Sequence, residues 1–248
     1  MLSLNPFLAE RLRDHFADKR TLRSYKIYTA SLCVIIFATW PSNPISYYLQ
    51  FSSKPITLAT TFMVMFLFVI VLSMAEEYSR SSSRNSLADW IVFSPVHIGR
   101  VLWGRFQFFI LHSAFLLILP APLILTAAAA SGLLIKDILA AGSVVLMFCV
   151  FTKVLILMLE LIFRRMYMRT VCMCLFLIFA VLLSARYSPA ANPILAVQLL
   201  IGKSSRSGDA LFFTWTDTLV LYGTAMIAAW AVSTYKLIRL RKEAEVSR

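Results

Sequence analysis

The sequence predicts an all-α membrane protein, folded as a single membrane domain over residues 1–248. Of the 248 residues, 60% are hydrophobic and 15% are charged, and the mean hydropathy is +0.78. Soluble domains are about 45–50% apolar and about 25% charged, so this chain is too apolar to fold around a core in water. The apolar residues also gather in six segments separated by polar stretches, and no internal repeat or soluble domain is visible.

The six apolar segments are predicted to cross the membrane as helices. A spanning helix needs roughly 20 apolar residues, with about 17–25 as the usual range. The second, third, fourth and sixth segments have this length, and the first and fifth are slightly shorter. The predicted spans are residues 25–40, 56–75, 106–130, 138–159, 170–185 and 218–237.

The distribution of basic residues predicts the orientation. Most of the 24 lysines and arginines lie in residues 1–26, 76–105, 161–169 and 236–248, and cytoplasmic segments of membrane proteins carry such an excess. Both termini are therefore predicted to be cytoplasmic, and the expected location is the plasma (inner) membrane. Anionic lipid explains the net charge of +12. Nucleic-acid binding is not expected, because the basic residues form no single stripe.

The first 24 residues predict an amphipathic helix that lies on the inner leaflet and turns into the first span. Asn5 can cap this helix, and Pro6 suits its first turn. Its apolar positions recur every four residues at Leu8, Leu12 and Phe16. Charged residues cover the rest of its surface, as expected for a helix at a membrane interface.

A second short helix is predicted in the cytoplasmic segment 76–105. Ser86 can cap it, Asp89 follows three residues later as in a capping box, and Pro95 ends it. Its aromatic and aliphatic side chains would be exposed unless a partner protein covered them. The residues predicted to dock this partner are Ser86, Leu87, Asp89, Trp90, Ile91, Phe93 and Pro95.

Two features are predicted toward the outer side. Pro120 and Pro122 should kink the third span or end it early. Within the external segment 186–217, a helix is predicted to start at Asn192 and stop at Gly202. Its nine or so residues reach only about 13 Å, so we expect a re-entrant helix at the outer mouth. The predicted gate residues are Asn192, Pro193, Leu195 and Leu199.

Three polar residues, His112, Lys153 and Glu160, fall within or at the end of spans and are candidates for a translocation path. A lysine at mid-bilayer costs roughly 2.5–3.5 kcal/mol on insertion scales, so it usually faces a cavity or a partner. Lys153 could instead snorkel inward or pair with Glu160, and Glu160 could pair with Arg164. His112 could be a packed histidine with one hydrogen bond. The four cysteines lie in apolar spans and are expected to be packing residues rather than metal ligands.

The order of these motifs resembles the ABC-2-type permeases, the membrane subunits of ATP-driven exporters. The matching runs are NPFLAERLR at residues 5–13, LADWIVFSPVHIGRVLWGR at 87–105, NPILA at 192–196 and the basic tail 236–242. The resemblance implies that the first run is an elbow helix and that the second contains the coupling helix. The acidic-Gly-Thr run that such permeases often have before the coupling helix is replaced here by residues 80–86.

The resemblance also implies partners and a mechanism. The chain has no GxxxxGK[ST] motif, so it is expected to be no enzyme and to bind no cofactor. ATP and Mg²⁺ would belong to a separate cytoplasmic ABC ATPase, and a second permease copy or paralogue would complete a dimer. ATP-driven closure of the ATPases would move the coupling helix and rock the attached spans outward.

An intramembrane metalloprotease of the CAAX type is the alternative. Glu76, Glu77 and Arg80 form an EExxR string, and Phe108 and His112 form an FxxxH string. No histidine follows His112, and the two that precede it, at positions 15 and 97, lie in segments predicted to be cytoplasmic. A single imidazole would under-ligate a hydrolytic zinc, so no metal is expected. A non-transporting membrane anchor for an ATPase is the remaining alternative.

Overall fold

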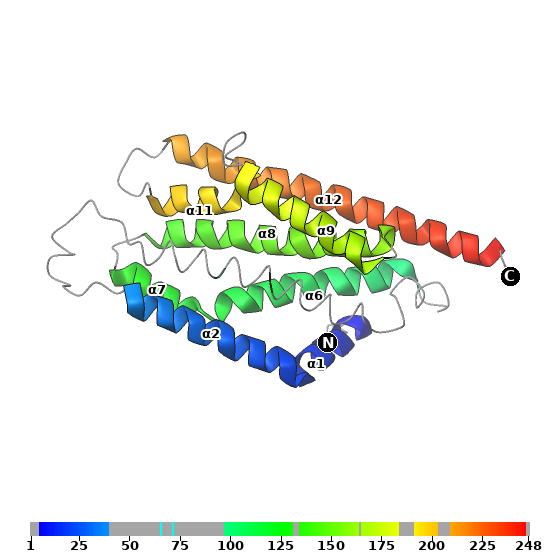
Figure 1. Ribbon diagram of the computed structural model, residues 1–248, viewed down its shortest axis with the longest axis horizontal. Helices are drawn as coiled ribbons and strands as arrows, with labels where there is room; N and C mark the ends of the chain where they lie inside the picture. The colour runs from blue at the N-terminus through cyan, green and yellow to red at the C-terminus, as the bar shows by residue number, and fades with distance from the viewer. Residues whose placement is uncertain are drawn as a thin grey trace.

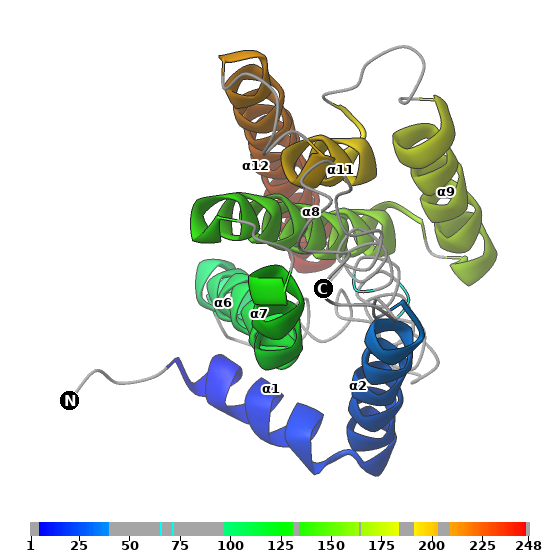
Figure 2. The same ribbon diagram turned by 90° about the vertical axis from the view of Figure 1, so that its left-hand side faces the viewer.

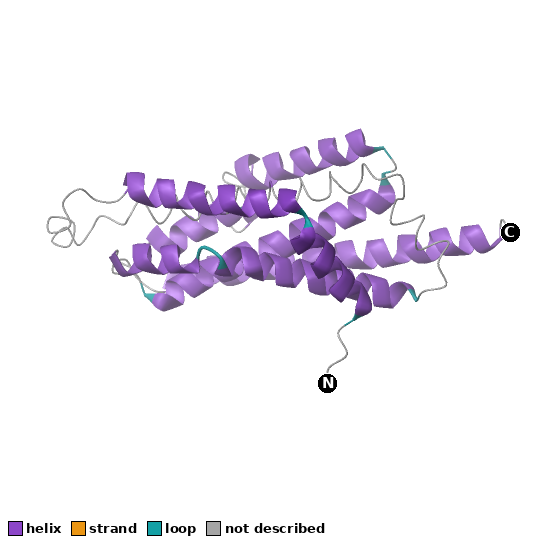
Figure 3. Cartoon of the chain, turned by 90° about the horizontal axis from the view of Figure 1, so that it is seen from below, coloured by secondary structure: helices purple, strands orange, loops and turns teal. Residues whose placement is uncertain are grey.

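The computed structural model describes residues 5–39, 65, 71, 97–130, 134–163, 165–183, 191–202 and 209–246. In these ranges the chain is helical apart from short connections, and Figure 3 shows no strand among them. The all-α fold class is confirmed. The elements are α1 (Pro6–Ala17), α2 (Lys19–Thr39), α6 (Ile98–Ile118), α7 (Ala121–Ala130), α8 (Ile135–Ile162), α9 (Met166–Ile178), the π-helical turn η1 (Phe179–Leu183), α11 (Pro193–Gly202) and α12 (Asp209–Val246).

The long helix α8 lies at the centre of the bundle. It contacts α6 on one side and α11 and α12 on the other, and these helices run side by side (Figure 1). Seen end-on, α9 lies at the margin beside α11, and α1 and α2 lie beyond α6 (Figure 2). The starts of α1 and α6 and the ends of α8 and α12 share one end of the molecule, at the right of Figure 1.

Three of the described helices are long and apolar enough to cross a membrane: Ile98–Ile118, Ile135–Ile162 and Thr216–Glu245. Many large apolar side chains on the outside of the bundle are exposed, Phe37 and Ile227 among them. Lipid or a protein partner covers such surfaces in membrane proteins. The structure therefore supports a helical membrane protein. The remaining predicted spans correspond to α2, to α9 with η1, and to a segment that is largely outside the described residues.

The third predicted span is divided into two helices. α6 ends at Ile118, and a turn at Leu119 and Pro120 separates it from α7. Proline has no N–H to continue the helix, and its carbonyl accepts the first hydrogen bond of α7, from the Ile124 N–H at 3.0 Å. The predicted break is confirmed. α6 also starts at Ile98, eight residues before the predicted start of the span. The helix includes Arg105, which is buried although its charge lowers the local hydropathy.

Two apolar clusters hold the bundle together. One surrounds the first half of α8 and includes Phe148, which packs against Tyr222 of α12. The other surrounds the end of α8, where Leu157 packs in one cluster with Leu8 of α1 and Leu237 of α12. The second cluster anchors α1 to the spans, although α1 itself is too short to cross the membrane.

Candidate functional site

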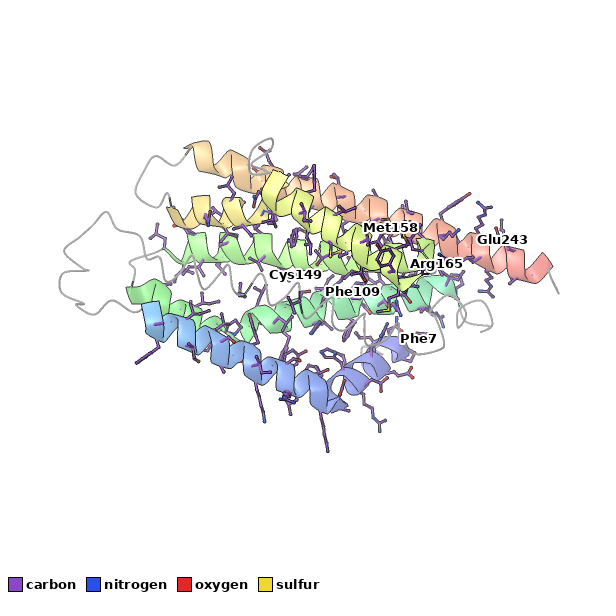
Figure 4. The ribbon with its side chains drawn as sticks, viewed as in Figure 1. Phe7, Phe109, Cys149, Met158, Arg165 and Glu243 are labelled. Atoms are coloured by element: carbon purple, nitrogen blue, oxygen red, sulfur yellow. The ribbon has the colours of Figure 1, made fainter. Side chains whose placement is uncertain are left out.

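The start of α1 is fixed against α6 by a short side chain. The Asn5 Oδ1 accepts a hydrogen bond from the Phe7 N–H at 3.2 Å, as the sequence predicted for a cap. The Asn5 Nδ2 also donates to the Arg100 carbonyl oxygen at 3.0 Å. A Cβ added at Gly104 would lie 3.1 Å from both the Asn5 Nδ2 and the Phe7 Cβ. Glycine at 104 thus lets α1 approach α6 closely, and Phe7 lies at this contact (Figure 4).

The buried face of α1 differs from the predicted stripe. Leu8 and His15, two turns apart, are buried, whereas Phe16 is 50% exposed. Leu12 packs partly against the second cluster. The sequence placed His15 in a segment predicted to be cytoplasmic, which stays a prediction, and the structure adds that its side chain is buried against the bundle. A histidine can face the bundle because its ring nitrogens find polar partners there.

A chain of hydrogen bonds that begins at His15 links side chains from four helices. The His15 Nε2 bonds the Tyr25 hydroxyl, and the same hydroxyl lies 2.8 Å from the His112 Nε2. The other ring nitrogen of His112, Nδ1, lies 2.5 Å from the Lys153 Nζ. These residues belong in turn to α1, α2, α6 and α8. The four side chains are 5%, 7%, 3% and 3% exposed, so the chain lies inside the protein. We call it the polar chain.

Aromatic rings enclose the polar chain. Phe108 stacks on His112, with ring centroids 5.6 Å apart and planes 13° from parallel. The rings of His15 and His112 meet edge-to-face at 4.4 Å. Phe115 contacts the ring of Tyr25 at 5.4 Å. Hydrogen bonds are strong in such apolar surroundings, and a broken one is correspondingly costly.

The direction of these hydrogen bonds follows from the protonation state of Lys153. When Lys153 is an ammonium it only donates, and the His112 Nδ1 accepts from it. The proton of the neutral imidazole is then on Nε2, which donates to the Tyr25 oxygen. The Tyr25 O–H is left to donate to the His15 Nε2. With Lys153 as an ammonium, the polar chain therefore has one donor direction along its whole length, from α8 to α1.

An ion pair joins α6 and α8 nearer the shared end of the bundle. The Arg105 Nη1 lies 3.6 Å from the Glu160 Oε2, and both side chains are 11% exposed. From the sequence, Arg164 and Lys153 are both candidate ion-pair partners of Glu160. In the structure Glu160 lies against Arg105 instead. Lys153 lies against His112, as described above. The prediction of a buried, hydrogen-bonded His112 is confirmed.

A helix is present where one was predicted, as α11 from Pro193 to Gly202, and its external, re-entrant position stays a prediction. The Asn192 Oδ1 accepts from the Leu195 N–H at 3.0 Å, so Asn192 caps the helix. Its Nδ2 donates to the Val181 carbonyl oxygen of η1 at 2.8 Å. The Tyr222 hydroxyl of α12 donates to the Ala191 carbonyl oxygen at 2.5 Å. Among the gate residues Asn192 and Pro193 are buried and Leu195 is half-buried, while Leu199 lies in the last turns of α11.

Several predicted residues lie outside the described ranges. These include the whole coupling segment, Ser86 to Pro95, and the glutamates of the protease motif, Glu76 and Glu77.

Two residues of the polar chain were missed, His15 and Tyr25. The spacing of seven residues between Leu8 and His15 places both on one face of a helix, and this spacing could have indicated that His15 faces inward.

Within the described part of the chain, no three His, Cys, Asp or Glu side chains are placed to hold a metal ion. Of the cysteines only Cys149 is buried. Cys172 is half-buried, and Cys33 and Cys174 are exposed, so the expectation of buried packing residues is wrong for these last two. An outward-facing cysteine is inexpensive in a membrane helix, because the thiol is itself apolar enough to face lipid.

Comparison with known proteins finds no family model that matches this chain and no curated protein that matches its sequence.

Proposed function

We propose that this chain is a permease subunit of an ABC-2-type transporter, which exports its substrate with energy supplied by a separate cytoplasmic ATPase. The observation that carries the proposal is the packing of α1 against α6. A short amphipathic helix precedes the first span and is fixed by Asn5 against the first turns of α6. α6 begins directly after the segment that matches a coupling helix. An elbow helix and a coupling helix in this order are the features by which the sequence resembles such permeases.

The contacts of α6 support a lever mechanism. Force applied by an ATPase to residues 86–95 would reach Ile98, the first residue of α6. The ion pair between Arg105 and Glu160 and the polar chain then join α6 to α8. α1 would move with α6, because Gly104 lets the two helices pack closely. In this proposal the protein has six spans with both termini cytoplasmic, and a second permease copy or paralogue completes the path.

Docking of the ATPase can be tested by purification. The permease is co-expressed with the ABC ATPase of its own gene neighbourhood and purified through a tag on the permease. Replacing Trp90 and Phe93 with Glu removes the apolar side chains predicted to be covered, so recovery of the ATPase should fall at least tenfold. The control is Tyr167→Glu, an exposed aromatic residue of α9 at the same predicted side of the membrane. Equal recovery from all three proteins would refute the docking assignment.

One observation from the structure favours the alternative function as an intramembrane metalloprotease. His15 lies beside His112 and supplies a second imidazole next to the predicted motif. Two observations weigh against it: the Tyr25 hydroxyl bonds the Nε2 atoms of both histidines, and Lys153 brings a cation to the His112 Nδ1. We expect purified protein to contain less than a tenth of a zinc equivalent. Near-stoichiometric zinc that Glu77→Ala removes would favour the protease. Recruitment of an ATPase without any transport would favour the anchor.

A further inference from the structure

We propose that His15, Tyr25, His112 and Lys153 form a proton relay, which moves one positive charge between α8 and α1. The inference rests on the contacts of the polar chain and does not depend on the proposed transport function. Three consecutive hydrogen bonds connect the ammonium nitrogen of Lys153 to the Nε2 of His15. Each intermediate group both accepts and donates a proton, which is the requirement for transfer along a hydrogen-bonded chain.

The relay has two states that contain the same atoms and the same total charge. In the first state Lys153 is an ammonium and both histidines are neutral. Transfer moves one proton from the Lys153 Nζ to the His112 Nδ1, one from the His112 Nε2 to the Tyr25 oxygen, and the Tyr25 hydroxyl proton to the His15 Nε2. In the second state Lys153 is a neutral amine, His112 is the Nδ1–H tautomer, and His15 is an imidazolium. Every hydrogen bond survives the transfer with its direction reversed.

The positions of Lys153 and His15 determine where the positive charge lies in each state. Lys153 lies nine residues before the end of α8, which corresponds to about 14 Å at 1.5 Å per residue. α8 is a candidate membrane span, and His15 lies in the last turn of α1, beside α2, with its ring centroid 4.4 Å from that of His112. Lys153 is 3% and His15 is 5% exposed, so the relay moves a charge from one helix to another inside the bundle without bringing it to the surface.

The relay also links charge to helix packing. His15 holds α1, Tyr25 holds α2, and His112 and Lys153 join α6 to α8. A movement of α1 or α2 that separates any pair would break the path and leave the charge at one end. Contact between the elbow region and the spans thus determines whether Lys153 can give up its proton.

The test uses the full-length protein in lipid nanodiscs with ¹⁵N-labelled histidine. The chain has three histidines, and exposed His97 reports protonation by solvent. Spectra are recorded at a pH at which His97 is neutral. Under these conditions N–H signals at both the Nε2 and the Nδ1 of His15 mark the imidazolium that the relay produces, whereas an N–H signal at Nε2 alone marks the other neutral tautomer. In the wild type we expect the ¹⁵N shift of the His15 Nε2 to lie between the values of an acceptor nitrogen and an N–H nitrogen.

Three variants distinguish proton transfer from a static hydrogen bond. Lys153→Arg retains a cationic donor, but a guanidinium does not give up its proton in proteins, so the His15 Nε2 signal should move to the acceptor value. Tyr25→Phe removes the middle of the path, so adding Lys153→Arg should then leave the His15 signal unchanged. Tyr28→Phe is the matched control. Tyr28 is buried one turn further along α2 and donates to the Leu116 carbonyl oxygen at 3.2 Å, outside the relay, so the arginine effect should persist.

Two results would overturn the relay. The first is a wild-type His15 Nε2 signal at the acceptor value that Lys153→Arg does not change, because the chain would then be a static network. The second is an arginine effect of full size in the Tyr25→Phe background, because the proton would then travel by another route. If Lys153→Arg does not fold, Lys153→Met replaces it, and the same loss of N–H character at His15 is expected.

Discussion

The close packing of α1 on α6 predicts a specific sensitivity at Gly104. An added Cβ would lie 3.1 Å from the Phe7 Cβ and the Asn5 Nδ2, closer than side chains normally approach. Replacing a helical glycine with alanine ordinarily gains about 0.8–1.0 kcal/mol in helix propensity. Inserting a methyl group into a tightly packed contact costs about 1–3 kcal/mol. The packing cost should exceed the gain, so Gly104→Ala should reduce the stability by up to about 2 kcal/mol.

Gly142 offers the matched control, because it is a glycine of α8 at which an added Cβ meets no atom within 4 Å. Gly142→Ala should therefore retain the gain in propensity and be neutral or stabilising. The two variants should differ by about 1–3 kcal/mol, or about 2–12 °C in Tm at about 2–4 °C per kcal/mol for a chain of this size. Thermal unfolding of the full-length protein in detergent measures this difference. A Gly104→Ala protein as stable as Gly142→Ala would refute the close approach of α1 to α6.

Three further outcomes are expected. Glu160→Gln should lower the stability by about 3 kcal/mol, because it leaves Arg105 buried without its partner, and Glu160→Leu combined with Arg105→Met should recover most of this loss in the same assay. Asn192→Ala removes the cap of α11 and the bond to the Val181 carbonyl; it should cost about 1–3 kcal/mol and speed hydrogen exchange in α11. Single cysteines along residues 194–201, in a background without native thiols, should react with an external impermeant maleimide in a helical pattern. Reaction only from the cytoplasmic side would invert the predicted topology.

Local signals predicted some elements closely. The limits of α11 follow from Asn192, Pro193 and Gly202, since a cap, a proline and a glycine act on the backbone within one turn of where they stand. The break between α6 and α7 follows in the same way from Pro120, which removes one backbone donor. Membrane character follows from composition, and the structure supports it with three candidate spans.

The polar chain could not be predicted, because its contacts join residues far apart in the sequence. Tyr25 and His112 are 87 positions apart, and Lys153 and His112 are 41 apart. The sequence places His15 in the cytoplasmic segment before the first span and Arg105 in the cytoplasmic segment 76–105, because both stand among charged residues. Both side chains are buried because specific partners on other helices compensate them. A sequence average contains no information about such partners.

We propose that a cytoplasmic ATPase moves α6, and this movement can be measured as an ATP-dependent distance between two permease copies. Trp103 is exposed near the start of α6, so a spin label at this position reports the movement of that helix. The complex of permease and ATPase is reconstituted in nanodiscs, and label distances are measured without nucleotide and with the ATPase trapped by ATP and vanadate. We predict a distance distribution that shifts on trapping, and no shift when Trp90 and Phe93 are replaced with Glu. An unchanged distribution in a complex that binds and hydrolyses ATP would contradict the account.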